Sequence, residues 1–529
     1  MKAFYEDYSS LGQFSHTDLA YINHDPKLEE FFAYKPSKES ISEALEMRKK
    51  FAADRGLLLK VLKKQYSNLQ LQLPVKDDVI LNENTFTVVT SHQPTLLTGA
   101  LFHIYKIASV IHLCQNLNKE NPGQKFLPVF IMSGEDHDWP EVNHFHLFGR
   151  RYEWNRNASG PCGRLSLEGL NEVIESVSEL FNNVPFAEEI KTKLSESLTK
   201  AKNYGEFHSL LVASLFAEFG LIVLNLDDKE LKEAFIPIFE KEIKERFSHH
   251  HVTKTQSRLE QKGFKIQAFC RPVNMFYMTD EVRERLDPIE DGLIRVGSGV
   301  KYTMDEIITE LHAHPERFSP NVILRPLYQE FILPNIAYVG GGGELAYWLE
   351  RKDQFSEAKV HYPILIRRNS LLTIDAATKN QLNKLGLESK DMLANLDVIN
   401  RNFLHKHSKN ELTYETELKL IQDAYNELAA KAEKIDPTLS KAIMAEENKQ
   451  IKLFEQLGSR LERAEKQQQD TQIKKVQKLK EKLFPENGLQ ERHENFLSFY
   501  ANEGPEWIKG IIEICDPWIE KFILVESVE

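Results

Sequence analysis

The stretch from Leu127 to His146, LPVFIMSGEDHDWPEVNHFH, constrains the fold of this chain more than any other. It begins with an apolar run whose β-branched and aromatic side chains are typical of a buried strand, and the run stops at Ser133-Gly134. Carboxylate, imidazole and amide side chains follow at once. In α/β folds, ligands gather beyond the carboxyl ends of parallel strands. We therefore predict a functional site directly after this strand.

A further strand and a helix precede this stretch. The composition predicts a strand from Phe86 to Thr90, a turn from Ser91 to Gly99, and a helix from Ala100 to Leu117 that ends before Asn-Pro-Gly at 121–123. Together with the strand from Leu127, these segments predict a βαβ unit with parallel strands. The first turn and the acidic loop should then open on the same edge of the sheet.

The first turn and the helix behind it carry candidate substrate-binding groups. These are Gln93, Thr98, Gly99, His103 and Lys106. The polar side chains can bond a polar substrate, the glycine permits close approach of the backbone, and the helix amino terminus favours a carboxylate or phosphate. The alternative is a capped crossover helix with two solvated side chains. Neither a GxxxxGK[ST] phosphate loop nor a dinucleotide-binding GxGxxG occurs here.

The acidic loop admits three interpretations. Its candidate catalytic residues are Glu135, Asp136, His137 and Asp138, and its candidate binding residues are Asn143 and His144. Such side chains can hold a divalent metal, but their spacing matches neither HExxH nor a structural zinc motif, and we predict no metal site. In the second interpretation, a carboxylate and His137 form a general base and its orienting partner. In the third, the loop is solvated and its carboxylates cap a helix beginning near Trp139.

A second dense region runs from Asn321 to Tyr347. We predict a short strand over 322–324, a helix from Arg325, a strand over 336–339 and a helix from Glu344. The candidate binding residues are Arg325, Gln329, Glu330, Gly340, Gly341, Gly342, Gly343, Glu344 and Tyr347. Arginine offers a two-pronged fork to a carboxylate, and consecutive glycines leave amides exposed to an anion. The alternative is a tight turn that needs positive φ, although four glycines exceed that need.

Composition excludes several classes of protein. The 529 residues predict two to four structural units, and 79 acidic against 67 basic residues give a net charge of −12, which argues against nucleic-acid or membrane binding. The scattered cysteines are Cys114, Cys162, Cys270 and Cys515, with the spacing of reduced thiols rather than metal ligands. The amino terminus lacks a signal peptide pattern, and we find no transmembrane-length apolar segment. We expect a cytoplasmic protein.

The segment between the two dense regions predicts an inserted lobe. A helix over 204–219 leads into a strand over 221–226, and shorter strands are expected over 268–278 and 293–302 around a turn at Asp287-Pro288. We expect His249-His250-His251 to lie in a solvated loop.

The ends of the chain are predominantly helical in pattern. Residues 42–73 predict one or two amphipathic helices. Apolar residues recur in threes and fours over 421–435 and over 454–483, and Asp436-Pro437 interrupts the pattern, which predicts an antiparallel hairpin of long helices. Its apolar seam needs the core or a second subunit as a partner. Residues 364–366 and 522–525 are expected to be further strands of the core.

Three blocks carry a resemblance to a known family. TSHQPTLLTGALFHIYK, VFIMSGEDHDWPEVNH and RPLYQEFILPNIAYVGGGGELAYW, in this order, resemble the BshC family of cysteine ligases in bacillithiol biosynthesis, and the resemblance covers nearly the whole chain. It implies an α/β fold with a Rossmann-like parallel-sheet core similar to nucleotidyltransferases and class I aminoacyl-tRNA synthetases. It also implies inserted connective lobes, a carboxy-terminal α-helical coiled coil, and a homodimer formed through that coiled coil.

The resemblance also suggests boundaries for these parts. They are a helical segment over 1–80, core halves over 81–150 and 319–372, core continuation with inserted lobes over 151–318, the coiled coil over 373–484, and a return to the core over 485–529. Thr98-Gly99 stands where a synthetase HIGH motif would be, although neither HxGH nor a KMSKS-like stretch is present. ATP or ADP with Mg²⁺ is compatible with the sequence, and no motif establishes it, so the cofactor stays unknown.

The implied reaction joins L-cysteine to the amino group of glucosaminyl malate. On this hypothesis a carboxylate among residues 135–138 anchors the cysteine ammonium or accepts a proton from the sugar amine, and His137 relays that proton. Arg325 and the glycine amides of 340–343 hold the malyl carboxylates. The alternatives are a nucleotidyltransferase-like enzyme acting on another small amino-acid or sugar substrate, a metal hydrolase, and a coiled-coil scaffold. The enzyme hypotheses require Gln93, Asp136 and Gly342 to lie at one rim of the sheet.

Overall fold

The computed structural model describes residues 1–51, 53–408 and 414–527. The chain divides into two compact units. The first consists of residues 1–372 and 488–525, and the second consists mainly of residues 373–487. None of the helices in the described part of the chain combines the length and apolar composition needed to cross a membrane.

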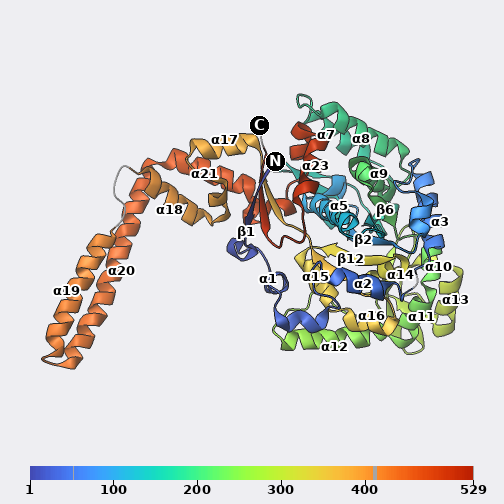
Figure 1. Cartoon of the computed structure of the whole chain (residues 1–529), viewed down its shortest axis with the longest axis horizontal. Helices are drawn as coiled ribbons and strands as arrows, with labels where there is room; N and C mark the ends of the chain where they lie inside the picture. The colour runs from blue at the N-terminus through green and yellow to red at the C-terminus, as the bar shows by residue number, and fades with distance from the viewer. Residues whose placement is uncertain (52, 409–413, 528–529) are drawn as a thin grey trace. The chain divides into compact units, whose positions relative to one another are not determined.

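A five-stranded parallel sheet forms the centre of the first unit (Figure 1). In spatial order its strands are β13 (Ile364–Arg367), β12 (Asn335–Gly340), β2 (Thr85–His92), β3 (Lys125–Met132) and β6 (Ile222–Asn225). Helix α5 (Phe102–Glu120) connects β2 to its parallel neighbour β3, which confirms the predicted βαβ unit. Because all five strands run in one direction, the loops that follow them emerge at one edge.

Helices cover both faces of this sheet. Alternate residues of β3 enter different apolar clusters: Val129 packs with residues of α3 (Arg55–Asn68), and Phe130 packs with residues of α5. The other covering and flanking helices of the core are α1 (His16–Ile22), α2 (Ser40–Arg48), α4 (Asp77–Leu81), α9 (Tyr204–Phe216), α14 (Arg325–Ile332), α15 (Gly342–Leu349), α16 (Lys352–Ala358), α22 (Leu497–Glu503) and α23 (Pro505–Ile514). Burial on two faces explains why β3 is apolar without polar alternation.

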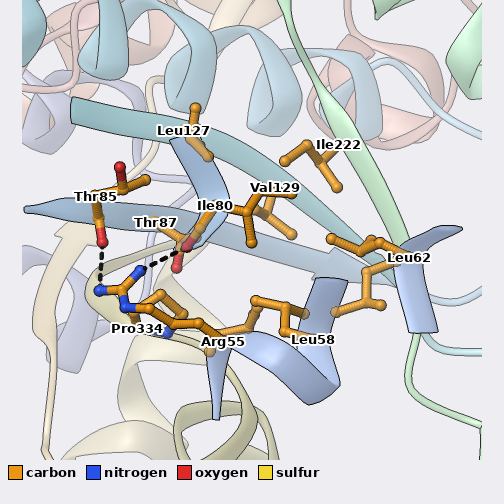
Figure 2. A pocket seen from close by; sticks show the side chains of 12 residues that line it. Arg55, Leu58, Leu62, Ile80, Thr85, Thr87, Leu127, Val129, Ile222 and Pro334 are labelled. Carbon is orange, nitrogen blue, oxygen red and sulfur yellow. Dashed lines mark hydrogen bonds between the residues drawn. The ribbon is translucent and has the colours of Figure 1, made fainter. Parts of the chain in front are cut away.

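Figure 2 shows how α3 packs against the sheet near the amino-terminal ends of β2 and β3. Arg55, at the start of α3, donates to the carbonyl oxygens of Ile80 at 3.1 Å and Thr85 at 2.7 Å. Beside it, a cavity of about 10 Å³ lies between Leu58 and Val129. That volume holds about one water molecule, so the cavity is a packing gap and not a ligand site.

The connective lobe is built on an antiparallel sheet of order β10-β9-β8-β7-β11. The strands are β7 (Met275–Met278), β8 (Arg283–Ile289), β9 (Gly292–Arg295), β10 (Lys301–Thr303) and β11 (Phe318–Pro320). The predicted turn at Asp287-Pro288 is wrong, because these residues lie inside β8 and the chain reverses at 290–291. Strand β7 pairs only with residues 283–285 of β8, so Pro288 lies where β8 has one neighbour and tolerates the missing N–H.

Helices and a short hairpin complete this part of the chain. They are α6 (Trp139–Val142), β4 (His144–Leu147), β5 (Arg150–Glu153), α7 (Leu170–Glu179), α8 (Ala187–Lys200), α10 (Lys229–Ala234), α11 (Ile236–Glu245), α12 (Phe247–Gln261) and α13 (Met304–Ala313). His249 to His251 lie within α12, not in the predicted loop. The buried residues Val252, Gln256 and Leu259 recur at helical spacing and hold that segment against the core.

Two predicted core strands are also corrected. Residues 322–324 form a turn, because the Asn321 side chain accepts hydrogen bonds from the N–H groups of Ile323 at 2.8 Å and Leu324 at 3.3 Å. Residues 522–525 do form a strand, β15 (Phe522–Glu526), but it belongs to a separate sheet with β1 (Lys2–Glu6) instead of the parallel sheet.

The second unit is helical. After β14 (Leu371–Ile374), its helices are α17 (Ala376–Lys384), α18 (Leu396–His407), α19 (Glu415–Glu433), α20 (Pro437–Gln468) and α21 (Asp470–Leu483). Helices α19 and α20 lie side by side and reverse at the predicted Asp436-Pro437 break (Figure 1). Leu420, Leu428 and Leu461 on this hairpin expose 66%, 52% and 55% of their surface.

Candidate active site

A pocket of about 660 Å³ opens beyond the carboxyl ends of β2, β3 and β12, and we call it the edge pocket. The predicted site residues that line it are Gln93, Asp136, His137, Arg325, Gly341, Gly343, Glu344 and Tyr347. Side chains of the connective lobe, among them Arg271, Phe276 and Arg283, form another part of its wall. The three dense regions of the sequence therefore meet at one rim of one sheet.

Asp136 is the carboxylate of the edge pocket that lies between two arginines. Gln93 Nε2 donates to its Oδ2 at 2.8 Å, and the guanidinium nitrogens of Arg283 and Arg325 lie 3.5 Å and 3.7 Å from its oxygens. Burial alone would raise the pKa of Asp136, but Arg325 and Arg283, with the Gln93 hydrogen bond, lower it to about 2. Asp136 is therefore a fixed negative charge that positions two arginines.

His137 lies beside this cluster with its ring against Phe276, at a centroid distance of 5.6 Å. Its Nδ1 accepts a hydrogen bond from Arg283 Nη1 at 3.1 Å. Partial burial, followed by the charge of Arg283, lowers the pKa of His137 below its ordinary value. His137 is thus a neutral imidazole at pH 7 whose Nδ1 lone pair is occupied.

Glu344 is a second fixed carboxylate in the edge pocket. It accepts hydrogen bonds from Lys106 Nζ at 2.8 Å, Tyr338 Oη at 2.7 Å and the Gly341 N–H at 2.9 Å. Burial raises its pKa, but Lys106 and these donors together hold the pKa of Glu344 below its ordinary value. Lys106, which was predicted to contact substrate, is buried and does not line the pocket. It binds the Glu344 carboxylate instead.

The four glycines do not form an open row of amides. The N–H of Gly341 is already bonded to Glu344, and Gly340 does not line the edge pocket. A Cβ at Gly342 would fall 2.0 Å from the carboxylate carbon of Asp18, so Gly342 is required for close packing against α1. The predicted anion cradle is thereby reduced to Gly341 and Gly343 as lining residues.

Two of the four predicted catalytic residues lie outside the edge pocket. Glu135 is buried and forms an ion pair with Lys232 Nζ at 2.5 Å, and Lys232 also lies 2.8 Å from Asp227. Asp138 is exposed and precedes α6 without capping it through its side chain. The loop therefore presents only Asp136 and His137 of this group to the pocket.

Most of the remaining candidates support the fold. Asn143 donates to Glu153 Oε1 at 3.0 Å and lies 3.2 Å from His144 Nδ1, so this pair orders the β4–β5 hairpin. Gln329 and Asn335 donate to Glu330 Oε1, each at 2.8 Å, at the amino end of β12, opposite the pocket. Burial raises the pKa of Glu330 to about 7.

The predicted turn residues Thr98 and Gly99 are also internal. Both have positive φ, 67° and 61°, and Asn495 donates to the carbonyl oxygen of Gly99 at 2.6 Å. A Cβ at Gly99 would lie 2.8 Å from Thr95, so glycine is needed for the tight turn that starts α5. Neither residue lines the edge pocket.

His103 belongs to a cluster of three tilted imidazoles, of which His103 and His208 are buried and His92 is half-buried. Its ring centroid lies 4.9 Å from that of His92 and 5.2 Å from that of His208. Burial lowers the pKa of His92 to about 4 and that of His208 to about 3, and it holds the pKa of His103 well below its ordinary value. All three are therefore neutral at pH 7.

This cluster of imidazoles predicts acid sensitivity of the fold. Unfolded histidine titrates near about 6.5, so between pH 6.5 and pH 4 the unfolded chain binds more protons and stability falls as the pH falls. Because the pKa of His92 is about 4, this residue alone should lower the free energy of unfolding by about 2 kcal/mol at pH 5. Thermal unfolding midpoints at pH 7 and pH 5 measure this, and the difference should shrink in His208→Gln but not in the exposed control His250→Gln. An equal difference in wild type and His208→Gln would contradict the prediction.

Several lining residues were not among the candidates predicted from the sequence, and the arginines and Glu141 matter most. Arg368 follows β13, so the strand-end rule that found the acidic loop could have found it. Glu141 stood inside the acidic loop, but the helical pattern suggested only a helix start. Arg271, Arg283 and Arg492 lie far from the dense regions, and no local pattern marks them.

Two of these arginines are left without an acidic partner among the described residues. Arg271 stacks over Phe269 at 5.0 Å, and Arg492 lies 6.0 Å from the centroid of Phe102. Arg368, in contrast, is paired with Glu491 at 2.8 Å. Unpaired guanidinium groups at a pocket are suited to bind an anionic ligand.

Within residues 1–51, 53–408 and 414–527, no group of three or more His, Cys, Asp or Glu side chains is arranged to hold a metal ion. The described histidines and carboxylates of the acidic loop point in different directions, as Glu135 and Asp136 illustrate. All four cysteines are buried and unbridged.

Two family models together cover the chain. The bacillithiol biosynthesis BshC N-terminal Rossmann-like domain matches residues 7–369, and the BshC C-terminal coiled-coil domain matches residues 371–527. This chain is 35% identical to the protein named "Putative cysteine ligase BshC" from Flavobacterium johnsoniae, and the alignment covers 98% of both chains. It is 36% identical to the protein of the same name from Flavobacterium psychrophilum, again over 98% of both chains. One from Bacillus cereus is 30% identical over 68% of this chain and 69% of its own. The chain therefore belongs to the BshC family and is a ligase with a role in bacillithiol biosynthesis.

Proposed function

We propose that this chain joins the carboxyl group of L-cysteine to the amino group of glucosaminyl malate, the last step of bacillithiol biosynthesis. The observation that carries the proposal is the charge pattern of the edge pocket, in which fixed carboxylates and unpaired guanidinium groups share one space of about 660 Å³. That volume lies in the range of pockets that hold small-molecule ligands. The membership in the BshC family supports the same reaction.

The cationic side of the pocket fits the sugar acid. Arg271 and Arg492 lack acidic partners among the described residues, and Arg325 lies 3.7 Å from Asp136 with further N–H groups to donate. Malate carries two carboxylates, and each matches the planar fork of an arginine. These three arginines would hold the malyl group.

The anionic side fits the ammonium group of cysteine. Glu344 lines the pocket, exposes 26% of its side chain and is kept ionised by Lys106. A pre-positioned carboxylate binds an ammonium without being reoriented on binding. In this arrangement Asp136 holds Arg283 and Arg325 in place.

The decisive experiment incubates the purified full-length protein with L-cysteine and glucosaminyl malate and identifies products by mass spectrometry. Parallel reactions with and without ATP and Mg²⁺ determine which agent activates the cysteine carboxyl. We expect the mass of bacillithiol only when both substrates are present. Product formation from other amino acids or sugars, with none from this pair, would instead support a nucleotidyltransferase-like enzyme acting on another substrate.

We also propose that the α19–α20 hairpin joins two copies of this chain. Its exposed leucines, including Leu420, Leu428 and Leu461, lie along a long helical hairpin, where a second hairpin could cover them. Light scattering after gel filtration should give twice the mass of 61.3 kDa, and Leu461→Glu should shift it toward the monomer. A wild-type monomer at micromolar concentration would contradict the proposal.

A further inference from the structure

One carboxylate that lines the edge pocket has no cationic partner among the described residues. Among the described residues its lining carboxylates are those of Asp136, Glu141 and Glu344. Asp136 is paired with two arginines and Glu344 with Lys106, as described above. Glu141 forms no ion pair with any described Lys, Arg or His side chain. Glu141 is thus the lining carboxylate whose oxygens are not held by a cation and can accept a proton.

The fold holds Glu141 in a defined position. It lies on the single turn of α6, whose flanking residues Trp139 and Val142 are buried. Trp139 packs edge-on against Trp154 at a centroid distance of 5.1 Å, which anchors the turn to the core. Glu141 is exposed on the opposite side of this turn and faces the pocket.

We propose that Glu141 is the general base that removes a proton from the amino group of the sugar substrate. The inference rests on the proposed function, because it assigns the proton acceptor for that same reaction. In the step, a proton passes from the ammonium nitrogen to a Glu141 carboxylate oxygen, so an N–H bond breaks and an O–H bond forms. The nitrogen keeps the electron pair, which forms the C–N bond to the carbonyl carbon of an activated cysteine carboxyl group. The bond from that carbon to the oxygen of the activating group breaks, and this oxygen leaves with the bonding electrons. The protonated Glu141 returns its proton to water, to which it is exposed.

The surroundings of Glu141 favour this role. The charged groups that act on it are Asp138 and Asp136, and both are negative. Partial burial, then Asp138, raise the pKa of Glu141 above its ordinary value, although Gln93 opposes the shift through a hydrogen bond. A base whose pKa lies closer to the working pH accepts a proton more readily in the transition state.

The imidazole of His137 is not suited to this role. Because an arginine can only donate, the contact from Arg283 requires Nδ1 of His137 to be the acceptor. A neutral imidazole then carries its hydrogen on Nε2, so neither nitrogen has a lone pair to offer. His137 would act as a hydrogen-bond donor to substrate, and Glu141 would act as the base.

The test compares Glu141→Gln with the full-length wild-type protein in steady-state conjugation. We expect kcat to fall by at least about a hundredfold while KM for glucosaminyl malate changes little, because glutamine keeps the shape but cannot accept the proton. Glu141→Asp should recover part of kcat. The matched control is Glu175→Gln, the same change on an exposed position of α7.

The dependence on pH separates catalysis from a structural effect. Wild-type kcat/KM should rise with pH as Glu141 ionises, and Glu141→Gln should lose that rise. Wild-type kcat in Glu141→Gln, or a raised KM with unchanged kcat, would overturn the inference and leave Glu141 at most a binding group. If the wild-type protein forms no conjugate, the proposed function fails instead, so the two failures are distinguishable.

Discussion

Replacing Asp136 with asparagine is expected to lower kcat/KM for conjugation by at least about a hundredfold. The substitution keeps the shape of the side chain but removes the negative charge between Arg283 and Arg325. Arg283 exposes only 3% of its side chain, so its charge cannot be compensated by water. Both guanidinium groups would move. Arg325 is one of the groups that we assign to the malyl carboxylates, so substrate binding would be disturbed.

The comparison for this prediction is Asp138→Asn, which makes the same change two residues away. Asp138 is exposed and does not line the edge pocket, so we expect a loss smaller than about tenfold, through its weaker influence on Glu141. Steady-state kinetics of both purified variants measure the ratio. Equal losses in the two variants would show that Asp136 has no special role.

Replacing Lys232 with methionine is expected to destabilise the first unit by about 3–5 kcal/mol. Lys232 is fully buried and lies 2.5 Å from Glu135 and 2.8 Å from Asp227. Burial disfavours its charge, yet the two carboxylates raise the pKa of Lys232 above its ordinary value. Asp227 keeps a second partner in Arg164, at 2.7 Å, whereas Glu135 is left buried without a cation.

The thermal unfolding midpoint measures this effect. Lys254→Met, the same change at an exposed position of α12, should leave the midpoint nearly unchanged. Adding Glu135→Gln to Lys232→Met should recover part of the loss, because it removes the uncompensated charge. An unfolding midpoint of Lys232→Met equal to that of the wild type would contradict this prediction. The ion pair with Lys232 would then not be what keeps Glu135 out of the edge pocket.

The strand and helix pattern of the core was readable from local sequence. The apolar run of β3, the helical spacing of α5 and the glycines around the start of α15 each reflect burial or backbone geometry of that segment alone. Parallel pairing then places the ends of β2, β3 and β12 at one edge. Local exceptions arose where a side chain competed with the backbone, as Asn321 does in the turn at 322–324.

The direction of each polar side chain was not contained in any local pattern. Glu135 and Asp136 are neighbours of the same chemical type, yet one points to Lys232 in the core and the other to Arg283 in the edge pocket. The sequence thus placed an acidic loop at the end of a parallel strand, because strand burial is a short-range property. Which carboxylates face the pocket depends on cations that stand about a hundred or more residues away, and only the folded chain brings those charges within a few ångströms.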